Sequence, residues 1–413
     1  MQALRTGRPA RLAACAPPAT TRPNATFPIA AAIGLLVSTA ACRPQPTRDV
    51  AIQRAVSFLW SQQRADGAWP SATHGIVSGG TAWTPFVLHT LSDIPESRHD
   101  NRANFPAGLD FIRRSVDTGG AVGLFNPVEP DFPALEYPNY ATSYALRALR
   151  ELGTEDDSAL VARMSSYLLS QQWVETRGVG PEHPAYGAWG FGEVSLQLGD
   201  VGHVDLSHTR RVLEALRPAE PETRVKALRF LGLLQKSISD GREILGIPQN
   251  SINADGGFYA SPIINETNKA GISIDQNGRA FFRSYATATC DGILAMLAAG
   301  VDPTDERIRA ALQWLSDNPE LQHVPGIPAT EDGNWEDVMF YYHLAVRSSV
   351  LATLEPNSPD LRRIESLIIA NQARDGSFSN PLGAPNKEDD PLLATSLALI
   401  ALTNIHRLDT SAW

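Results

Sequence analysis

The chain has 413 residues, of which 43% are hydrophobic and 19% are charged, the balance of a folded globular protein. Its formal net charge is −10 at pH 7. The first 41 residues contain four arginines and no acid, so the remainder is more acidic than this total. An acidic chain lacks the basic stripe that phosphate backbones require, and we expect no nucleic-acid partner.

The first feature in chain order is an export signal. An arginine-containing lead precedes the apolar run FPIAAAIGLLVSTAAC (27–42), which ends in small residues and a cysteine. Thr39-Ala40-Ala41-Cys42 is similar to a bacterial lipobox, with Thr where Leu or Val is usual. We expect residues 1–41 to be a lipoprotein-type signal peptide, Cys42 to be lipidated and 42–49 to be a linker. Ordinary cleavage after a small residue and an uncleaved anchor remain alternatives. The expected location is the membrane of a bacterial cell envelope.

A repeated helix-and-turn pattern follows. The clearest copies are SFLWSQQRADGAW (57–69) and SLIIANQARDGSF (366–378), and weaker copies run over 228–259, 167–192 and 331–335. The apolar residues have helical spacing, so each helix needs a partner for one face. The Asp-Gly pair ends the helix because glycine accepts the left-handed conformation. The Gln and the following aromatic residue are expected to fix the turn, the ring by burial and the amide by bonding to backbone.

After each turn comes a second helix rich in small residues. The six stretches are 79–91, 139–149, 204–216, 284–297, 340–354 and 389–402. Seven residues before the last Leu of each stands one of Thr84, Thr142, Thr209, Cys290, Arg347 and Thr395, which suggests equivalent positions. Repeats at this spacing predict an array of helical hairpins. We expect inner helices to begin near residues 81, 139, 205, 283, 336 and 389.

The Q-x-x-D-G-x-W turn resembles the repeat of squalene–hopene cyclases and of protein prenyltransferase β subunits. This resemblance covers about residues 50–405 and implies an all-α fold, an α6/α6 toroid of six outer–inner hairpins closed in a double ring. We therefore expect one toroid domain over 50–413. The segments 283–315, 339–348 and 388–402 are most similar to exported bacterial squalene-cyclase-like repeat proteins. Related toroids serve as enzymes or as binding domains, so the fold does not decide the function.

In such a toroid the amino ends of the inner helices meet at one mouth of a central cavity. We expect a ligand cavity there for a lipid, an isoprenoid or another small molecule. An aromatic wall suits such ligands. The simpler interpretation of any acid at these positions is helix capping. The candidate cavity residues are Trp83, Tyr140, Asp205, His208, Tyr285, Tyr341 and His343.

An acidic pair at the start of the last inner helix is the candidate catalytic site. Squalene–hopene cyclases protonate an alkene with the middle Asp of a D-x-D-D-T motif, and Asp389 matches that Asp while Asp390 matches its neighbour. Lys387 and Pro391 depart from the motif. A lysine that favours carboxylate works against a strong acid, and an Asp before Pro is typical of a helix cap.

Protein prenyltransferases bind Zn²⁺ through an Asp-x-Cys pair and a later His. Here Cys290 and Asp291 are adjacent and point about 100° apart on a helix. An alternative zinc set is Cys290, His343 and Asp205, with His208 as a further candidate. A lone buried Cys more often acts as a small hydrophobic residue. We expect no cofactor and no metal in the main interpretation.

Two functions follow from these patterns. The first is an exported toroid that binds a ligand or partner at the cell envelope. The second is a terpenoid cyclase-type enzyme, an isomerase of the cyclase/mutase kind, with Asp389 as proton donor. The broken acid motif and the export signal favour the first. The repeat resemblance and the Asp389-Asp390 pair favour the second, and the sequence leaves open whether the protein is an enzyme.

Overall fold

The structure is a computed structural model that describes residues 46–94, 104–122, 137–192, 200–237, 250–264, 267–329 and 334–410. All of these residues belong to one compact unit. The expected signal peptide and Cys42 lie outside the described residues, as does most of the weak copy of the turn at 331–335.

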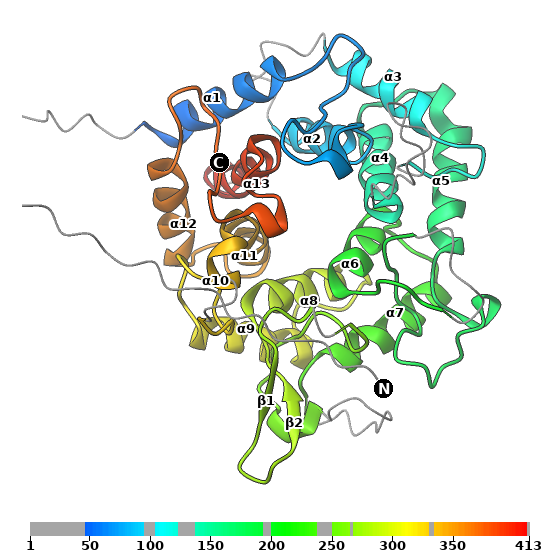
Figure 1. Cartoon of the computed structure of the whole chain (residues 1–413), viewed down its shortest axis with the longest axis vertical. Coiled ribbons are helices and arrows are strands. Elements are labelled where there is room, and N and C mark those ends of the chain that lie inside the picture. The colour runs from blue at the N-terminus through cyan, green and yellow to red at the C-terminus, as the bar shows by residue number, and fades with distance from the viewer. Residues whose placement is uncertain are drawn as a thin grey trace, which may run out of the picture. The chain divides into compact units, whose positions relative to one another are not determined.

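Twelve helices form two concentric rings (Figure 1). The outer ring consists of α1 (Arg48–Ser61), α3 (Phe105–Ser115), α5 (Ser158–Ser170), α7 (Pro221–Leu234), α9 (Glu306–Asp317) and α12 (Pro359–Ala370). The inner ring consists of α2 (Trp83–Ser92), α4 (Pro138–Leu152), α6 (Leu206–Ala215), α8 (Ala286–Ala298), α11 (Phe340–Leu354) and α13 (Pro391–Thr410). The predicted α6/α6 toroid is confirmed, and each inner helix begins within four residues of its predicted start.

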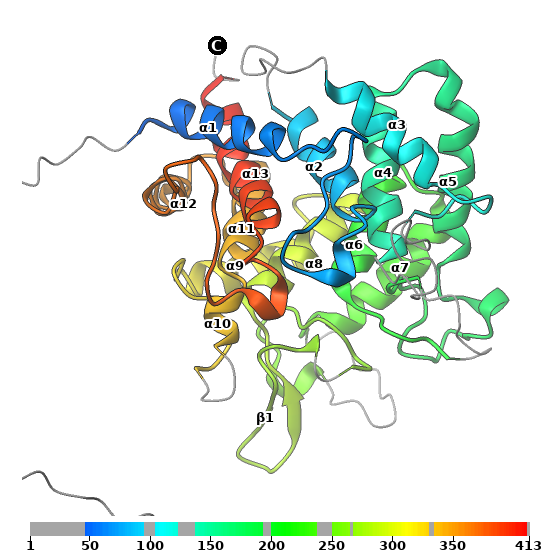
Figure 2. The same ribbon diagram turned by 45° about the horizontal axis from the view of Figure 1, so that its top comes forward.

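The inner ring is closed by packing between consecutive inner helices. Each inner helix contacts the next, and α13 contacts α2 to complete the circle. The outer helices pack against the outside of this ring, as Figures 1 and 2 both show. The helices pack into one continuous hydrophobic core that includes residues from every inner helix. Each inner helix packs against two inner neighbours and against the outer ring. Small side chains allow this close packing on several faces of the helix, which explains why the inner helices are rich in them.

The Gln and Gly of the repeated turn join neighbouring outer helices. The side-chain amide of Gln63 donates to the carbonyls of Gly67 and Asn104, and that of Gln372 donates to the carbonyls of Gly376 and Ala51. Gly67 and Gly376 have φ of +89° and +93°. A Cβ on them would lie 2.0 Å from the Ala107 carbonyl oxygen and 2.3 Å from the Arg54 carbonyl oxygen. Only glycine permits this conformation together with this close approach.

A threonine of the inner helix fixes the far side of five of the turns. Its hydroxyl accepts the backbone N–H two residues after the turn glycine. The residues are Thr84, Thr142, Thr209, Thr289 and Thr395. In α8 the equivalent residue is therefore Thr289, so the prediction of Cys290 is wrong by one residue. The predicted equivalence also fails at Arg347, which instead donates to the Leu315 and Asn318 carbonyls at the end of α9.

A β-hairpin and a short helix lie beside the rings. The strands β1 (Ile272–Ile274) and β2 (Ala280–Phe282) pair antiparallel, with Ile272 opposite Phe282, and this hairpin projects from the toroid (Figure 2). The sequence pattern does not predict this hairpin. The short helix α10 (Trp335–Val338) precedes α11. Among the described residues one stretch, Pro391–Leu408 of α13, is long and apolar enough to cross a membrane, but 67% of it is buried in the fold, as expected of a core helix.

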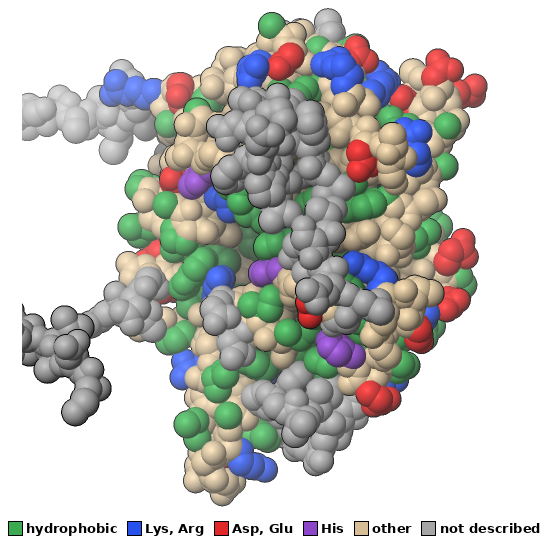
Figure 3. Space-filling view, turned by 45° about the vertical axis from the view of Figure 1, so that its right-hand side comes forward, with side chains coloured by type: hydrophobic (Ala, Val, Ile, Leu, Met, Phe, Trp, Pro, Cys, Tyr) green, Lys and Arg blue, Asp and Glu red, His purple; other side chains and the backbone are tan. Residues whose placement is uncertain are grey.

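The outer surface carries charges of both signs. In Figure 3 basic and acidic side chains are interspersed around the edge of the face shown. Histidine side chains also lie toward the middle of that face, next to hydrophobic ones.

Candidate functional site

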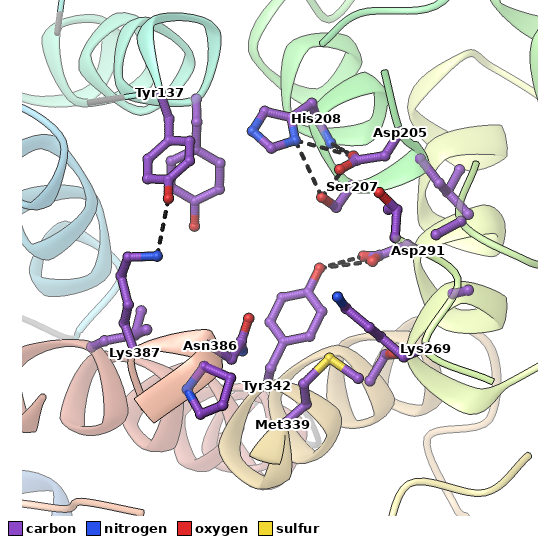
Figure 4. A pocket seen from close by; sticks show the side chains of 18 of the residues that line it. Tyr137, Asp205, Ser207, His208, Lys269, Asp291, Met339, Tyr342, Asn386 and Lys387 are labelled. Atoms are coloured by element: carbon purple, nitrogen blue, oxygen red, sulfur yellow. Dashed lines mark hydrogen bonds and ion pairs between the residues drawn. The ribbon is translucent and has the colours of Figure 1, made fainter. Parts of the chain in front are cut away.

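A cavity of about 340 Å³ lies inside the inner ring, and helices far apart in the sequence form its wall. Aromatic residues make up much of this wall: Trp83, Phe86, Tyr137, Tyr140, Phe191, Tyr285, Trp335 and Tyr342. Cavities of this size and apolar character are typical of small-molecule sites. The polar side chains are concentrated at a few places (Figure 4).

One polar group consists of two histidines and an aspartate at the start of α6. One ligand atom from each of His203, Asp205 and His208 lies within 4.8 Å of the others. His203 Nε2 lies 2.8 Å from Asp205 Oδ2, and His208 Nδ1 lies 3.0 Å from Asp205 Oδ1. All three residues line the cavity. Burial opposes ionisation of Asp205, but the two histidines lower the pKa of this carboxyl well below its usual range, so it is ionised.

Local structure holds this group in place. Asp205 is the N-cap of α6, and its Oδ1 accepts the backbone N–H of His208 at 2.9 Å. The His203 ring stacks on Phe191, with ring centroids 3.8 Å apart and planes 12° apart. Gly190 makes this approach possible, because a Cβ there would lie 1.9 Å from the His203 carbonyl oxygen.

A second acid of the wall, Asp291 on α8, is part of a buried ionic network. Asp291 Oδ1 accepts from Arg210 Nη1 at 2.7 Å, and the Tyr342 hydroxyl lies 2.7 Å from Asp291 Oδ2. Arg210 also donates to Glu214 at 2.6 Å. Burial raises the pKa of Glu214, but Arg210 and Arg211 lower it by more, to about 2. Asp291 therefore links three inner helices, α6, α8 and α11.

Two lysines bring positive charge to the cavity. Lys387 Nζ lies 3.0 Å from the Tyr137 hydroxyl, and in Figure 4 Lys387 lies across the cavity from Asp205. Both Lys387 and Tyr137 have positive φ, 64° and 51°. Such conformations are uncommon away from glycine and cluster at functional sites. Lys269 Nζ lies 3.7 Å from the centre of the Trp335 ring.

The three acids before α13 do not line the cavity. Asp389 Oδ1 lies 2.7 Å from His74 Nε2, and Asp390 Oδ1 accepts the Leu392 backbone N–H at 2.8 Å. Asp390 Oδ2 accepts from the Ser71 hydroxyl. Glu388 is fully buried and accepts the backbone N–H groups of Tyr341 and Tyr342 at 2.9 Å each. Burial raises the pKa of Glu388 to about 7 although these N–H groups oppose the rise.

The structure places the predicted cavity residues in two sets. Trp83, Tyr140, Asp205, His208 and Tyr285 line the cavity. Tyr341 and His343 do not line it; both are buried, on faces of α11 other than the one that carries Tyr342. Asp389 and Asp390 also lie outside the cavity lining.

The alternative zinc set is not brought together. Among the described residues, the one grouping of three or more His, Cys, Asp or Glu ligand atoms at metal-binding distance is His203, Asp205 and His208. Cys290 and His343 are fully buried away from the cavity wall. Burial raises the pKa of the Cys290 thiol to about 12 and lowers that of His343 to about 3, so Cys290 stays protonated and unsuited to binding a metal.

Several residues of the cavity were not assigned to it by sequence reasoning: Tyr137, Phe191, His203, Lys269, Asp291 and Lys387. Most of them lie in loops or one helical position away from a predicted residue. The spacing His203-x-Asp205-x-x-His208 was the one signal in the sequence that pointed to the cluster.

No family model matches the sequence, and no curated protein matches it. Solved structures do match. A variant of the type II terpene cyclase MstE from Scytonema, in complex with its product merosterolic acid A, has a TM-score of 0.53 at 14% identity, covering 87% of this chain and 97% of that one. Another variant, in complex with the substrate geranylgeranyl dihydroxybenzoate, has a TM-score of 0.52 at 15% identity, covering 87% and 98%.

An α-1,6-mannanase of Salegentibacter, in complex with α-1,6-mannotriose, has a TM-score of 0.51 at 12% identity, covering 88% of this chain and 100% of that one. At such low identity these likenesses establish the fold and not the chemistry. The chain shares the α/α toroid fold with a terpene cyclase and a glycoside hydrolase.

Proposed function

We propose that this protein is an exported toroid that binds an isoprenoid-like small molecule in its central cavity at the bacterial cell envelope. The observation that carries the proposal is the aromatic-walled cavity of about 340 Å³. Each CH₂ group that a ligand buries against such a wall contributes about 0.8 kcal/mol. A chain of isoprene units offers many such groups without polar atoms that would need partners.

The charges at the cavity favour a ligand with an acidic or phenolic head. Lys387 and Lys269 line the cavity, and each lies against an aromatic ring, Tyr137 and Trp335. An anionic head beside Lys387 would form a charge-assisted hydrogen bond. The fold neighbour MstE supports this ligand class, since its substrate is geranylgeranyl dihydroxybenzoate.

Ligand analysis tests the proposal directly. Organic extraction of the natively purified protein, followed by mass spectrometry, should release an isoprenoid or a similar lipid. Quenching of tryptophan fluorescence by geranylgeranyl dihydroxybenzoate should then report binding, because Trp83 and Trp335 line the cavity. Mannotriose should give no signal. Saturable mannotriose binding without isoprenoid binding would contradict the proposal.

Two variants sharpen this test. Ala288→Phe should abolish binding by filling the cavity, since Ala288 lies in its wall. Lys387→Asn should weaken binding of an acidic ligand, because asparagine tolerates the left-handed backbone but carries no charge. Lys226→Asn is the matched control. Lys226 pairs with Glu175 and Glu222 and does not line the cavity, so its loss should leave binding unchanged.

The envelope location rests on residues 27–42, which lie outside the described residues. If Cys42 is lipidated, the wild-type protein should fractionate with membranes. Cys42→Ser should release it into the soluble fraction or block processing. A Cys42→Ser protein that stays membrane-bound with normal processing would rule out the lipid anchor.

A terpenoid cyclase with Asp389 as proton donor is the second candidate. The aromatic wall favours it, because ring faces stabilise carbocations. The contact of Asp389 with His74, away from the cavity lining, weighs against it. Cyclised product from a linear isoprenoid, lost in Asp389→Asn, would favour the cyclase over simple binding.

A further inference from the structure

The cluster of His203, Asp205 and His208 has the composition of a metal site. It offers two imidazole nitrogens and one carboxylate oxygen, all within 4.8 Å of one another. Imidazole and carboxylate together suit divalent first-row transition metals such as Zn²⁺. All three ligands come from six consecutive residues, so one short segment sets their geometry.

We propose that His203, Asp205 and His208 bind a divalent transition-metal ion in the wall of the central cavity. Three protein ligands are the number found in zinc sites that keep one position open for water or a ligand. Because all three residues line the cavity, that open position would face the space in which a small molecule sits. The inference goes beyond isoprenoid binding and does not depend on it.

The ligands are held in place by contacts that need no metal. Asp205 is fixed by its Oδ1, which caps α6, while Oδ2 faces His203. The His203 ring is fixed by stacking on Phe191. His208 sits in the first turn of α6, and its backbone N–H bonds to Asp205. A site whose ligands are already oriented loses less conformational entropy on binding an ion.

The hydrogen bonds within the cluster leave one atom unexplained. Nδ1 of His208 is engaged by Asp205, but Nε2 is buried and has no hydrogen-bond partner among the described residues. His208 is only 7% exposed. A buried polar nitrogen without a partner calls for an ion, a water or a ligand nearby. An ion in the cluster, with its bound water or ligand group in the cavity, supplies one.

The charge of the cluster also suits a cation. Asp205 supplies the carboxylate, and the two lysines of the cavity, Lys387 and Lys269, lie over the rings of Tyr137 and Trp335. Figure 4 places Lys387 on the opposite wall. Arg210, two residues from His208, is bound by Asp291 and Glu214. Among the described residues, Asp205 forms ion pairs with His203 and His208.

Metal titration tests the proposal. The full-length protein, without a histidine tag, is stripped with a chelator, and Zn²⁺ is then titrated in competition with a chromophoric chelator. One Zn²⁺ per chain should bind, and Mg²⁺ should not compete because it prefers oxygen ligands. Co²⁺ bound in place of Zn²⁺ should give a visible absorption spectrum of a nitrogen- and oxygen-ligated ion.

Variants assign the ion to the cluster. His203→Ala and His208→Ala should each weaken Zn²⁺ binding by more than about tenfold, since even the loss of a group behind a ligand costs that much. Asp205→Asn should do the same while keeping the cap oxygen of α6. His323→Ala is the matched control, because His323 also pairs with an aspartate, Asp337, but lies at the surface.

The outcomes are decisive in both directions. Tight binding of one Zn²⁺ that the cluster variants weaken and His323→Ala does not would support the proposal. Absence of Zn²⁺ binding to the wild-type protein would overturn it. Equal binding by the wild type and a folded His203→Ala/His208→Ala double variant, with folding checked by circular dichroism, would overturn it as well.

Discussion

The amino ends of α6 and α13 both have unpaired backbone N–H groups and acidic side chains beside them. The acid at α6 lines the cavity, whereas the acids at α13 do not. Each inner helix starts with unpaired backbone N–H groups, which an acidic side chain can satisfy. At α6 a single residue, Asp205, caps the helix and also faces the cavity between two histidines. At α13 three consecutive acids are present, and none of them lines the cavity.

The three acids before α13 all bind groups of the surrounding protein. Asp390 caps its own helix, Glu388 binds the first N–H groups of the neighbouring α11, and Asp389 pairs with His74. An acid at an inner-helix start is therefore not enough to indicate a catalytic group. What differs between the two helices is the preceding loop, which at α6 runs beside Phe191 and brings His203 to Asp205.

The largest expected effect in this comparison is on stability, at Glu388. Glu388→Ala would leave the N–H groups of Tyr341 and Tyr342 without their acceptor in a fully buried position. We expect the free energy of unfolding to fall by about 2–4 kcal/mol, as measured by denaturant titration. Glu320→Ala is the control, since Glu320 also accepts two backbone N–H groups but is exposed. If both variants lost the same free energy of unfolding, the burial of Glu388 would not be the cause of its effect.

The next effect is on pH dependence. The pKa of Glu388 is raised to about 7, so the folded state holds this proton more tightly than the unfolded state does. The resulting stabilisation is fully present below the ordinary glutamic acid pKa of about 4.3 and is lost as pH rises through about 7. Glu388→Gln, which cannot ionise, should flatten the stability profile across that window. Parallel profiles for the wild type and Glu388→Gln would contradict the raised pKa.

The ring itself was predictable because its determinants are local. Gln63, Gly67 and Thr84 act within one hairpin, and the sequence repeats that hairpin. The Gln amide bonds to backbone as expected, yet one of its two acceptors belongs to the next outer helix, as Ala51 does for Gln372. A pattern read within one unit cannot show a contact between units.

The cavity was only partly predictable, for a related reason. Tyr342 lies in the cavity wall, whereas its neighbours Tyr341 and His343 are buried between helices. Successive residues of a helix point in different directions, so an error of one residue in the helical phase assigns the wrong side chain to the wall. Loop residues such as His203 and Tyr137 have no periodicity that assigns them to a wall. The β1–β2 hairpin was missed because three-residue strands carry almost no alternating pattern.

A smaller effect is expected at the cap of α6. Asp205→Ala removes the acceptor for the His208 N–H and the partner of both histidines, and should lower the free energy of unfolding by about 1–2 kcal/mol. Asp205→Asn keeps a cap oxygen and should cost less. Thermal unfolding of the two variants measures the difference. If Asn were as damaging as Ala, the charge facing the histidines, rather than the cap, would dominate.

The smallest effect is expected at Asp389. Its carboxylate is partly exposed, with 23% of the side chain accessible, and its partner is the similarly accessible His74. Exposed pairs of this kind contribute about 0–1 kcal/mol, so Asp389→Asn should change the free energy of unfolding by less than about 1 kcal/mol. Because Asp389 lies outside the cavity lining, ligand binding measured by tryptophan fluorescence should be unchanged. Asp205→Asn, tested beside it, changes a carboxylate that does face the cavity. A folded Asp389→Asn protein that binds a linear isoprenoid but no longer cyclises it would reverse the comparison, because the functional acid would then belong to α13 and not to α6.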